Sequence, residues 1–522
     1  LRVAHATLTT DDPGYNRSGP ALTIASLANA RSVLYLGAET AVNGRFLVGY
    51  ASGSAGAVYQ TSGVVTNTGG SANDSRIGES GFGYYRVDDG LFANKGYLQL
   101  GRGSGATGIL DQRGGSVILN AGEAPADGVI GDYYNGSFTT RSGVGIFQLS
   151  GGIFNLNKHS FHLGEWAGEN TYSNGVGVLT LENDAQADVS YIILANRNGN
   201  PQAYVNLNGG RLTTSYFQKG GNNAADNTGM ALIGFNGGIL RVPASGSLVR
   251  TGANNAPALL SVYAGGALID TPNTTAVVLD QPLQAPANFG VTRVALSASG
   301  AGYIAPPAVL FTGGNGTGAT AVAEIDLNSG KLTSIRVTSA GVGYTSAPTV
   351  TLRGGGYTAI AAATATLGTI ASGGLTKLGE GSLTLNVPST YTGPTVVSNG
   401  TLRLASGNQP LAAASAITVA GGMLDLAGNT LTNNNPVVLA NGRLANGTLS
   451  APAFVKTGAG TVTLAVTPQH ASDTALFESY VRSLGPIVWY DPSDAATVTL
   501  DGTGRVSALL NKGSMGGMMD AA

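Results

Sequence analysis

The sequence predicts an all-β protein built as a parallel β-solenoid, in which short strands stack coil upon coil. Glycine accounts for 80 of the 522 residues, which is about twice its usual share. Hydrophobic residues make up 43%, and many of them alternate with polar residues, as in half-buried strands. Charged residues make up 11%, where about 25% is usual. Such a chain can bury a long core, and its composition is unlike that of an ordinary globular enzyme.

Residues 1–30 are an N-terminal segment, and a repeat begins near Arg31. Each unit begins with a short strand whose last four residues are an apolar residue, any residue, a second apolar residue and glycine. A variable polar loop, a second strand and a glycine pair follow. Copies include "FLVGYASGSAGAVYQTSG" and "LQLGRGSGATGILDQRGG". The glycines that end the first strand are spaced 29, 23, 30 and 33 residues apart, at Gly49, Gly78, Gly101, Gly131 and Gly164.

A repeat of this length predicts that residues 31–285 form a glycine-rich solenoid. Glycine allows the backbone to turn with positive φ at each corner, and the apolar side chains of one coil stack on those of the next. One coil alone cannot bury its apolar face, so only the stack is stable. A string of β-sandwiches is the alternative, because several Asn-Gly dipeptides in the sequence are typical of hairpin turns.

Residues 286–367 form a different, two-copy β module. Gly300, Gly302, Tyr303 and Pro307 recur 41 residues later, at Gly341, Gly343, Tyr344 and Pro348. A tyrosine packed over a glycine turn beside a proline is typical of a structural corner. The pair resembles a glycine-tyrosine-proline repeat that is inserted in large bacterial surface proteins.

Residues 368–468 contain the stretch "GGLTKLGEGSLTLNVPSTYTGPTVVSNGTLRLASG", from Gly373 to Gly407. Its strands alternate, with Leu383 and Leu385 on one face and Thr384 on the other. A weaker copy follows 79 residues later, where Lys456 and Gly458 correspond to Lys377 and Gly379. The stretch resembles the autotransporter-associated β-strand repeat. The resemblance implies a right-handed parallel β-helix and a role in the secretion and folding of a passenger across an outer membrane.

Residues 469–522 differ again. "SDTALFESYVRSLG" places apolar residues on one helical face after a Ser472 or Asp473 cap, and strands follow. This tail is similar to the opening of concanavalin-like or laminin-G-like lectin domains, but it is too short to close a two-sheet sandwich. The prediction is a short helix and the incomplete start of such a domain.

Charge and composition exclude several classes of partner. The net charge is −2 and no basic cluster occurs, so we expect no nucleic acid or anionic lipid partner. No apolar run is long enough to predict a membrane-spanning helix in this chain. The absence of cysteine excludes disulfides, thiolate metal sites and cysteine nucleophiles. It also favours export, because a long chain that crosses an envelope unfolded gains by having no thiol to crosslink.

No catalytic, cofactor or metal site is predicted. A lyase would need acids on neighbouring coils to hold calcium, and the candidate acids (Asp88, Asp89, Asp111, Glu165 and Asp188) are interpreted as solvated turn residues. His159 and His162 point to opposite faces if they lie on a strand. Aromatic residues in or beside the variable loops are candidates for glycan contact, although they also suit packing on the solenoid: Tyr84, Tyr85, Tyr133, Tyr134, Trp166 and Tyr172.

The sequence therefore predicts an extracellular structural protein of a bacterial surface. It would be an adhesin-like stalk or a subunit of a fibre joined head to tail, with itself or other surface proteins as partners. Stacking at about 4.8 Å per coil would give a rod of about 100 Å. The alternative is a carbohydrate-active protein, either a polysaccharide-binding module or a polysaccharide lyase.

Overall fold

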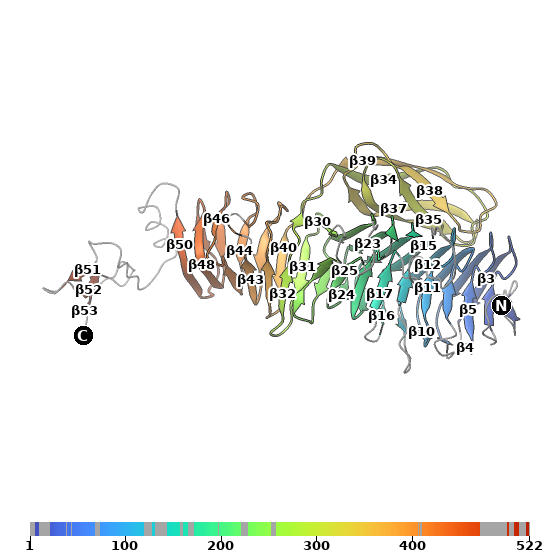
Figure 1. The fold of residues 1–522 in the computed structure, drawn as a ribbon, viewed down its shortest axis with the longest axis horizontal. Coiled ribbons are helices and arrows are strands. Elements are labelled where there is room, and N and C mark those ends of the chain that lie inside the picture. The colour runs from blue at the N-terminus through green and yellow to red at the C-terminus, as the bar shows by residue number, and fades with distance from the viewer. Residues whose placement is uncertain are drawn as a thin grey trace.

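A computed structural model describes residues 6–9, 21–37, 39–42, 44–67, 74–119, 128–130, 143–156, 160–164, 172–196, 198–220, 228–251, 257–405, 407, 410–469, 498–500, 506–510 and 518–520. These residues form strands and turns and include no helix. The predicted parallel β-helix is confirmed, because long parallel sheets run along the rod (Figure 1). No helix in the described part is long and apolar enough to cross a bilayer.

Three sheets form the sides of the N-terminal coils, and two further sheets accompany them. Sheet A has the order β1 (Ala6–Thr9), β2 (Ala21–Ile24), β5 (Arg45–Val48), β8 (Ser75–Ile77), β11 (Leu98–Leu100), β14 (Gly128–Ile130), β17 (Ser160–Leu163), β21 (Tyr191–Leu194), β25 (Phe217–Lys219) and β29 (Val249–Thr251). Sheet B has the order β3 (Arg31–Leu36), β6 (Ala55–Gln60), β9 (Phe82–Val87), β12 (Thr107–Gln112), β15 (Val144–Leu149), β19 (Val176–Leu181), β23 (Gln202–Leu207), β26 (Met230–Phe235), β30 (Leu259–Val262) and β33 (Leu283–Gln284). Sheet C has the order β4 (Thr40–Val42), β7 (Val64–Asn67), β10 (Leu91–Asn94), β13 (Ser116–Leu119), β16 (Ile153–Asn155), β20 (Gln186–Asp188), β24 (Arg211–Thr213), β27 (Ile239–Arg241), β31 (Ala267–Asp270), β40 (Leu375–Leu378), β42 (Thr395–Val397), β44 (Ile417–Val419), β47 (Val437–Leu439) and β49 (Phe454–Lys456). Sheet D pairs β18 (Tyr172–Ser173) with β22 (Asn198–Gly199), and sheet E contains β28 (Gly246–Ser247), β32 (Ala276–Leu279), β41 (Ser382–Leu385), β43 (Thr401–Leu404), β45 (Met423–Asp425), β48 (Gly442–Ser450), β46 (Thr430–Thr432) and β50 (Val462–Gln469).

Each N-terminal coil passes through sheets B, C and A in turn, as β6, β7 and β8 do. After the inserted module, a coil uses only sheets C and E. Ala55 pairs with Phe82, whereas Leu375 pairs with Thr395, so a coil shortens from 27 residues to 20. Sheet C continues through both parts, which makes them one stack.

The repeat glycines stand at the corner between sheets A and B. Gly78 directly follows β8 and has a φ of 77°. A Cβ atom on Gly78 would lie 2.2 Å from the carbonyl oxygen of Thr107 on the next coil. Both the positive φ and the close approach require glycine, which explains why the motif ends in this residue.

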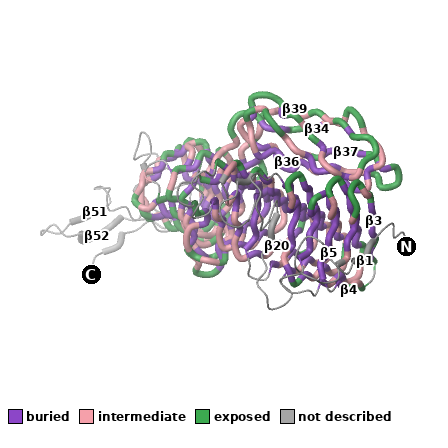
Figure 2. The backbone as a smooth tube through the Cα atoms, turned by 45° about the vertical axis from the view of Figure 1, so that its right-hand side comes forward, coloured by how far each residue is buried: buried purple, intermediate pink, exposed green. Residues whose placement is uncertain are grey.

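The core is a continuous column of apolar side chains inside the coils, and buried positions recur from rung to rung (Figure 2). Strands of sheet C alternate, so that β7 and β10 bury every second residue. Strands of sheet B differ, because β6, β12 and β15 are buried at every position. Their outer face must therefore be covered as well.

The cover is the inserted module. It consists of β34 (Phe289–Ala298), β35 (Ala308–Thr312), β36 (Thr317–Asp326), β37 (Lys331–Val342), β38 (Thr349–Arg353) and β39 (Ala362–Thr369), which form antiparallel sheets of two and four strands. Tyr303 and Tyr344, the two repeated tyrosines, are buried in its own core, which agrees with a structural corner. The chain leaves the stack after β33 and returns at β40, and the module folds back over coils nearer the N-terminus (Figure 1).

The module contacts coils along much of sheet B. Ala305 and Ala308 join an apolar cluster with Tyr59, Phe82 and Leu232. Hydrogen bonds supplement this cluster at both ends: the Arg31 guanidinium donates to the carbonyl oxygen of Gly302, the Tyr59 hydroxyl donates to the carbonyl oxygen of Ile304 at 2.7 Å, and Asn208 Nδ2 donates to the carbonyl oxygen of Thr338 at 2.6 Å. The module thus bridges many rungs from one side.

The described stack is shorter than the sequence predicts. The expected length of about 100 Å is wrong for the described stack, because the fourteen strands of sheet C span about 60 Å at about 4.8 Å per step. Residues 286–367 lie beside the stack and add no coils to it.

The predicted helix near Ser472 lies outside the described residues. Beyond it, β51 (Val498–Leu500), β52 (Val506–Leu510) and β53 (Met518–Asp520) pair as a small antiparallel sheet.

Candidate functional site

The space between the module and sheet B brings together polar groups from distant parts of the sequence. The outer face of sheet B carries a ladder of polar side chains, one per coil, because paired strands place equivalent residues side by side. In register along the rod these residues are Tyr59, Arg86, Asp111, Gln148, Thr180 and Asn206.

Ion pairs connect this side of the rod to the module. Arg336 of β37 holds Glu182 with two hydrogen bonds, at 2.6 and 2.7 Å. Arg113 contacts Asp111 at 2.9 Å and reaches Glu324 of β36 at 3.4 Å. Hydrogen bonds to Glu182 raise the pKa of Arg336. Burial disfavours the charge of Arg113, but the adjacent Asp111 carboxylate outweighs it, so the pKa of Arg113 lies above its usual value.

These groups line a polar cavity of about 420 Å³. Its walls also include Gln148, Ser150 and Asn208. A neighbouring cavity of about 260 Å³ has more apolar walls, with Ile146, Val178, Tyr204 and Tyr344 among them. Gln148 lines both cavities, so together they follow the seam between the module and the rod.

The carboxylates of the polar cavity are held by neighbouring side chains. Asp111 accepts hydrogen bonds from the Tyr84 hydroxyl at 2.6 Å and from Arg113, and Glu182 is held by Arg336 and Gln148. Both carboxylates are therefore already engaged as hydrogen-bond acceptors. In the described part of the chain, no three histidine, aspartate or glutamate residues gather as they would around a metal ion.

The strongest sequence motif lies elsewhere, in the stack at Gly373–Gly407. Its lysine, Lys377, is fully buried. Lys377 Nζ donates to the carbonyl oxygens of Leu378 at 2.6 Å, Gly379 at 2.8 Å and Asn399 at 3.3 Å. Burial lowers the pKa of Lys377 to about 8, and Asp270 opposes that shift. The lysine therefore closes a corner and joins it to the next coil.

The weaker copy uses the same arrangement. Lys456 Nζ donates to the carbonyl oxygens of Thr457 at 3.0 Å and Gly458 at 2.7 Å, and it reaches Ala440 of the preceding coil at 3.3 Å. The other charged groups of the main copy also fit a structural role. Arg403 pairs with Asp425 on the adjacent strand at 2.8 Å, and Glu380 is exposed.

Of the six aromatic candidates for glycan contact, the structure describes the side chains of two, Tyr84 and Tyr85. Tyr84 and Tyr85 lie in β9, with 1% and 0% of their surface exposed, which agrees with the alternative that they pack on the solenoid. Tyr84 faces the module and Tyr85 faces the core, because consecutive residues of a strand point to opposite sides. The side chain of Tyr172 in β18 and all of Tyr133, Tyr134 and Trp166 lie outside the described residues.

The acids considered for a lyase lie in different places on the molecule. Asp88 pairs with Arg86 at 2.6 Å beside an exposed Asp89, and Asp188 lies on sheet C. Asp111 was interpreted as a solvated turn residue, which is wrong, because it is 5% exposed under the module. His162 is buried in β17, where its Nε2 lies 2.8 Å from the Ser160 hydroxyl. Glu165 and His159 lie outside the described residues.

Sequence reasoning missed Gln148, Glu182, Glu324 and Arg336. One signal could have located their neighbourhood: the strands "FGYYRV", "VGIFQL" and "VGVLTL" are nearly continuous apolar runs, as expected for a sheet covered on both faces. That signal predicts a cover for this sheet but does not identify the module as the cover.

Comparison with known proteins gives one family match. Residues 375–404 match the passenger-associated-transport-repeat, which supports the resemblance stated for this stretch. The match covers β40 to β43, the strands closed by Lys377. No curated protein and no solved structure matches the chain. The family match lies in the stack and does not support the start of a lectin-like domain predicted in residues 469–522.

Proposed function

We propose that the chain is an extracellular structural protein of a bacterial surface, acting as an adhesin-like stalk. The observation that carries the proposal is sheet C, whose fourteen strands run through the N-terminal coils and the matched repeat without interruption. A stack of this kind holds whatever is attached to it at a fixed distance. The match to a passenger-associated repeat supports placement outside the cell.

The inner chemistry of the matched repeat supports a structural role. The Tyr391 hydroxyl lies 2.7 Å from Thr395 Oγ1, which lies 2.9 Å from Ser415 Oγ on the next coil. All three residues are buried. Polar groups that satisfy each other between coils stabilise stacking and leave little for a substrate.

The finer proposal is a fibre in which copies join head to tail. A solenoid has unpaired backbone N–H and C=O groups wherever its stack stops. Pairing the first coil of one copy with the last coil of another would satisfy both, and a contact of this kind that does not close generates a filament. Light scattering after size-exclusion chromatography tests it, since a chain that stays monomeric at high concentration contradicts the fibre.

The surface location has a separate test. Protease treatment of intact cells that make the full-length protein should remove it, while a cytosolic marker survives. Immunogold labelling without permeabilisation should place the protein on the outer surface. Detection only after lysis would contradict the proposal.

The proposal assigns the chain no enzymatic activity. Of the acids considered for a lyase, Asp88 and Asp111 are each paired with arginine, and Asp188 belongs to another sheet. Incubation with acidic polysaccharides, followed by ultraviolet absorption of unsaturated uronates, should show no product. Product formation would favour the alternative, a polysaccharide lyase.

A further inference from the structure

The outer face of sheet C is one long, partly exposed surface. Strands such as β10, β13 and β44 bury every second side chain and turn the others outward. Because the strands pair in register, the outward residues form rows along the rod. In the N-terminal coils this face lies on the side of the rod away from the module (Figure 1). It is therefore the longest surface that the rod can offer to a partner.

Both ends of this face lack charge. Among the outward side chains of the fourteen strands, charged residues occur only on the four neighbouring strands β20, β24, β27 and β31. Apolar residues stand on either side of that group, at Val64, Leu91 and Ile153 toward the N-terminus and at Val396, Val438 and Val455 toward the C-terminus. Ile153 is 44% exposed and Val455 is 39% exposed. Extended apolar surfaces of this kind are typical of interaction sites.

Two of the central charges have no ion pair within the chain. Arg241 pairs with Asp270 at 2.7 Å, whereas Asp188 and Arg211 have no ion-pair partner in the described residues. They lie on adjacent strands but in different rows, because Arg211 is in register with Gln186 and Asp188 is in register with Thr213. The face thus carries one unpaired charge of each sign close to its middle.

A second copy in the antiparallel direction supplies both missing partners. If β20 lies opposite the β24 of the second copy, the two-fold axis also places β24 opposite its β20. Asp188 then lies beside the partner's Arg211, and the equivalent ion pair forms a second time. The order of sheet C extends this register, so that β16 faces the partner's β27 and Ile153 meets the partner's Ile239. A parallel pair would place each strand opposite its own copy and would bring like charges together.

The contact is large enough for a specific dimer. In this register twelve of the fourteen strands overlap, which corresponds to about 55 Å along the rod, and strands of three or four residues are about 10–13 Å wide. Each copy would therefore cover about 550–700 Å², so that the two together come close to the ~1,200 Å² at which specific interfaces begin.

We propose that the outer face of sheet C joins the chain to a second copy, side by side and antiparallel. The product is a closed dimer, because a two-fold contact uses the same face of both copies. It uses the side of the stack and does not depend on the head-to-tail contact proposed for its ends.

Sedimentation velocity of the full chain over a wide range of concentrations tests the proposal. The mass should rise to that of two chains and stop there. Ile153→Lys should weaken the dimer at least tenfold, because it places two ammonium groups in the contact. Ile360→Lys changes a residue of the module that is 54% exposed and should leave the dimer unchanged. A monomer at every concentration, a mass that keeps growing, or equal effects of the two variants would overturn the proposal.

Introduced cysteines test the direction of pairing, since the chain has none of its own. Ile153→Cys and Ile239→Cys, carried on chains with different tags, should form a mixed disulfide dimer when they are combined and oxidised by air. Each variant alone should stay uncrosslinked, because the same residue of two antiparallel copies lies three coils apart. Crosslinking of one variant with itself, or none in the mixture, would contradict the antiparallel register.

Charge reversal provides an independent check. Asp188→Arg and Arg211→Asp should each form a weaker dimer alone, because each substitution opposes like charges across the contact. Mixing the two variants should restore the dimer, because both ion pairs can then form with reversed sign in one of them. A mixture that associates no better than the separate variants would rule out this pair of contacts.

Discussion

Replacing Gly78 by alanine should destabilise the stack far more than an ordinary glycine substitution. Gly78 follows β8 at a corner, and its N–H donates to the carbonyl oxygen of Val48 on the preceding coil at 2.7 Å. A Cβ atom would lie 2.2 Å from the Thr107 oxygen and 2.8 Å from the Gly108 nitrogen. Both atoms belong to the backbone, so no side chain can move aside.

The magnitude follows from two contributions. Holding alanine at a φ of 77° costs about 1–2 kcal/mol. Relieving the overlap requires the next coil to shift, which weakens hydrogen bonds between coils, so the whole change should cost about 3–5 kcal/mol. Ala195 shows that a corner can accept alanine, because it takes the equivalent place after β21 with a φ of 47°.

Gly428→Ala is the matched control. Gly428 has a φ of 85°, but a Cβ there would meet nothing within 4 Å, so only the conformational cost of about 1–2 kcal/mol applies. Urea unfolding followed by circular dichroism compares the two variants, and hydrogen exchange locates the damage. Gly78→Ala should lose protection in β8 to β12. Equal effects of the two substitutions would refute the argument from close coil approach.

Three further predictions concern charged groups. Burial without a partner lowers the pKa of Lys219 to about 8, so Lys219→Met should stabilise the chain by up to about 3 kcal/mol at pH 7. This gain should shrink as pH rises from 8 toward 10.5, because there the unfolded chain still binds the proton that the folded chain has lost; a gain independent of pH in urea titrations would contradict it. Lys377→Met should cost about 2–4 kcal/mol, because it leaves buried carbonyl oxygens without a donor, and an unchanged thermal midpoint would contradict that role. Arg336→Met should loosen the module by about 1–2 kcal/mol, since the pair is half exposed; hydrogen exchange in β36 and β37 should rise, whereas the exposed Lys331→Met should have no effect.

The coils were predictable because their signal is local. Gly49, Gly78 and Gly101 are fixed by a backbone turn within a few residues, and the same turn recurs in each coil. Lys377 and Lys456 could be aligned from spacing alone, and both close a corner. The spacing could not predict that Lys377 is buried, because the carbonyl groups that it contacts depend on how the next coil stacks.

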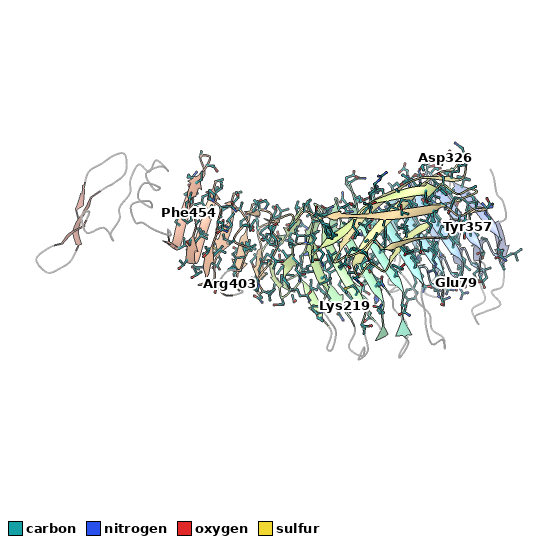
Figure 3. All side chains as sticks on the ribbon, turned by 90° about the horizontal axis from the view of Figure 1, so that it is seen from above. Glu79, Lys219, Asp326, Tyr357, Arg403 and Phe454 are labelled. Carbon is teal, nitrogen blue, oxygen red and sulfur yellow. The ribbon has the colours of Figure 1, made fainter. Side chains whose placement is uncertain are left out.

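The seam was not predictable, because it depends on where the module folds. Glu182 and Arg336 are 154 residues apart in sequence, and nothing local to either indicates the other. The burial of Tyr84 could not be predicted for the same reason: the sequence places it in or beside a variable loop, whereas it lies in β9 on the face that the module covers. In Figure 3, Tyr357 and Asp326 lie on the module, whereas Lys219 and Arg403 lie on the coils.

Electron microscopy of the native protein on the surface of intact cells tests the central claim most directly. The account predicts antibody-labelled rods outside the cell, thickened along one side by the module, either single or joined end to end. Labelled material confined to the cell interior, or compact particles without an elongated stack, would contradict it.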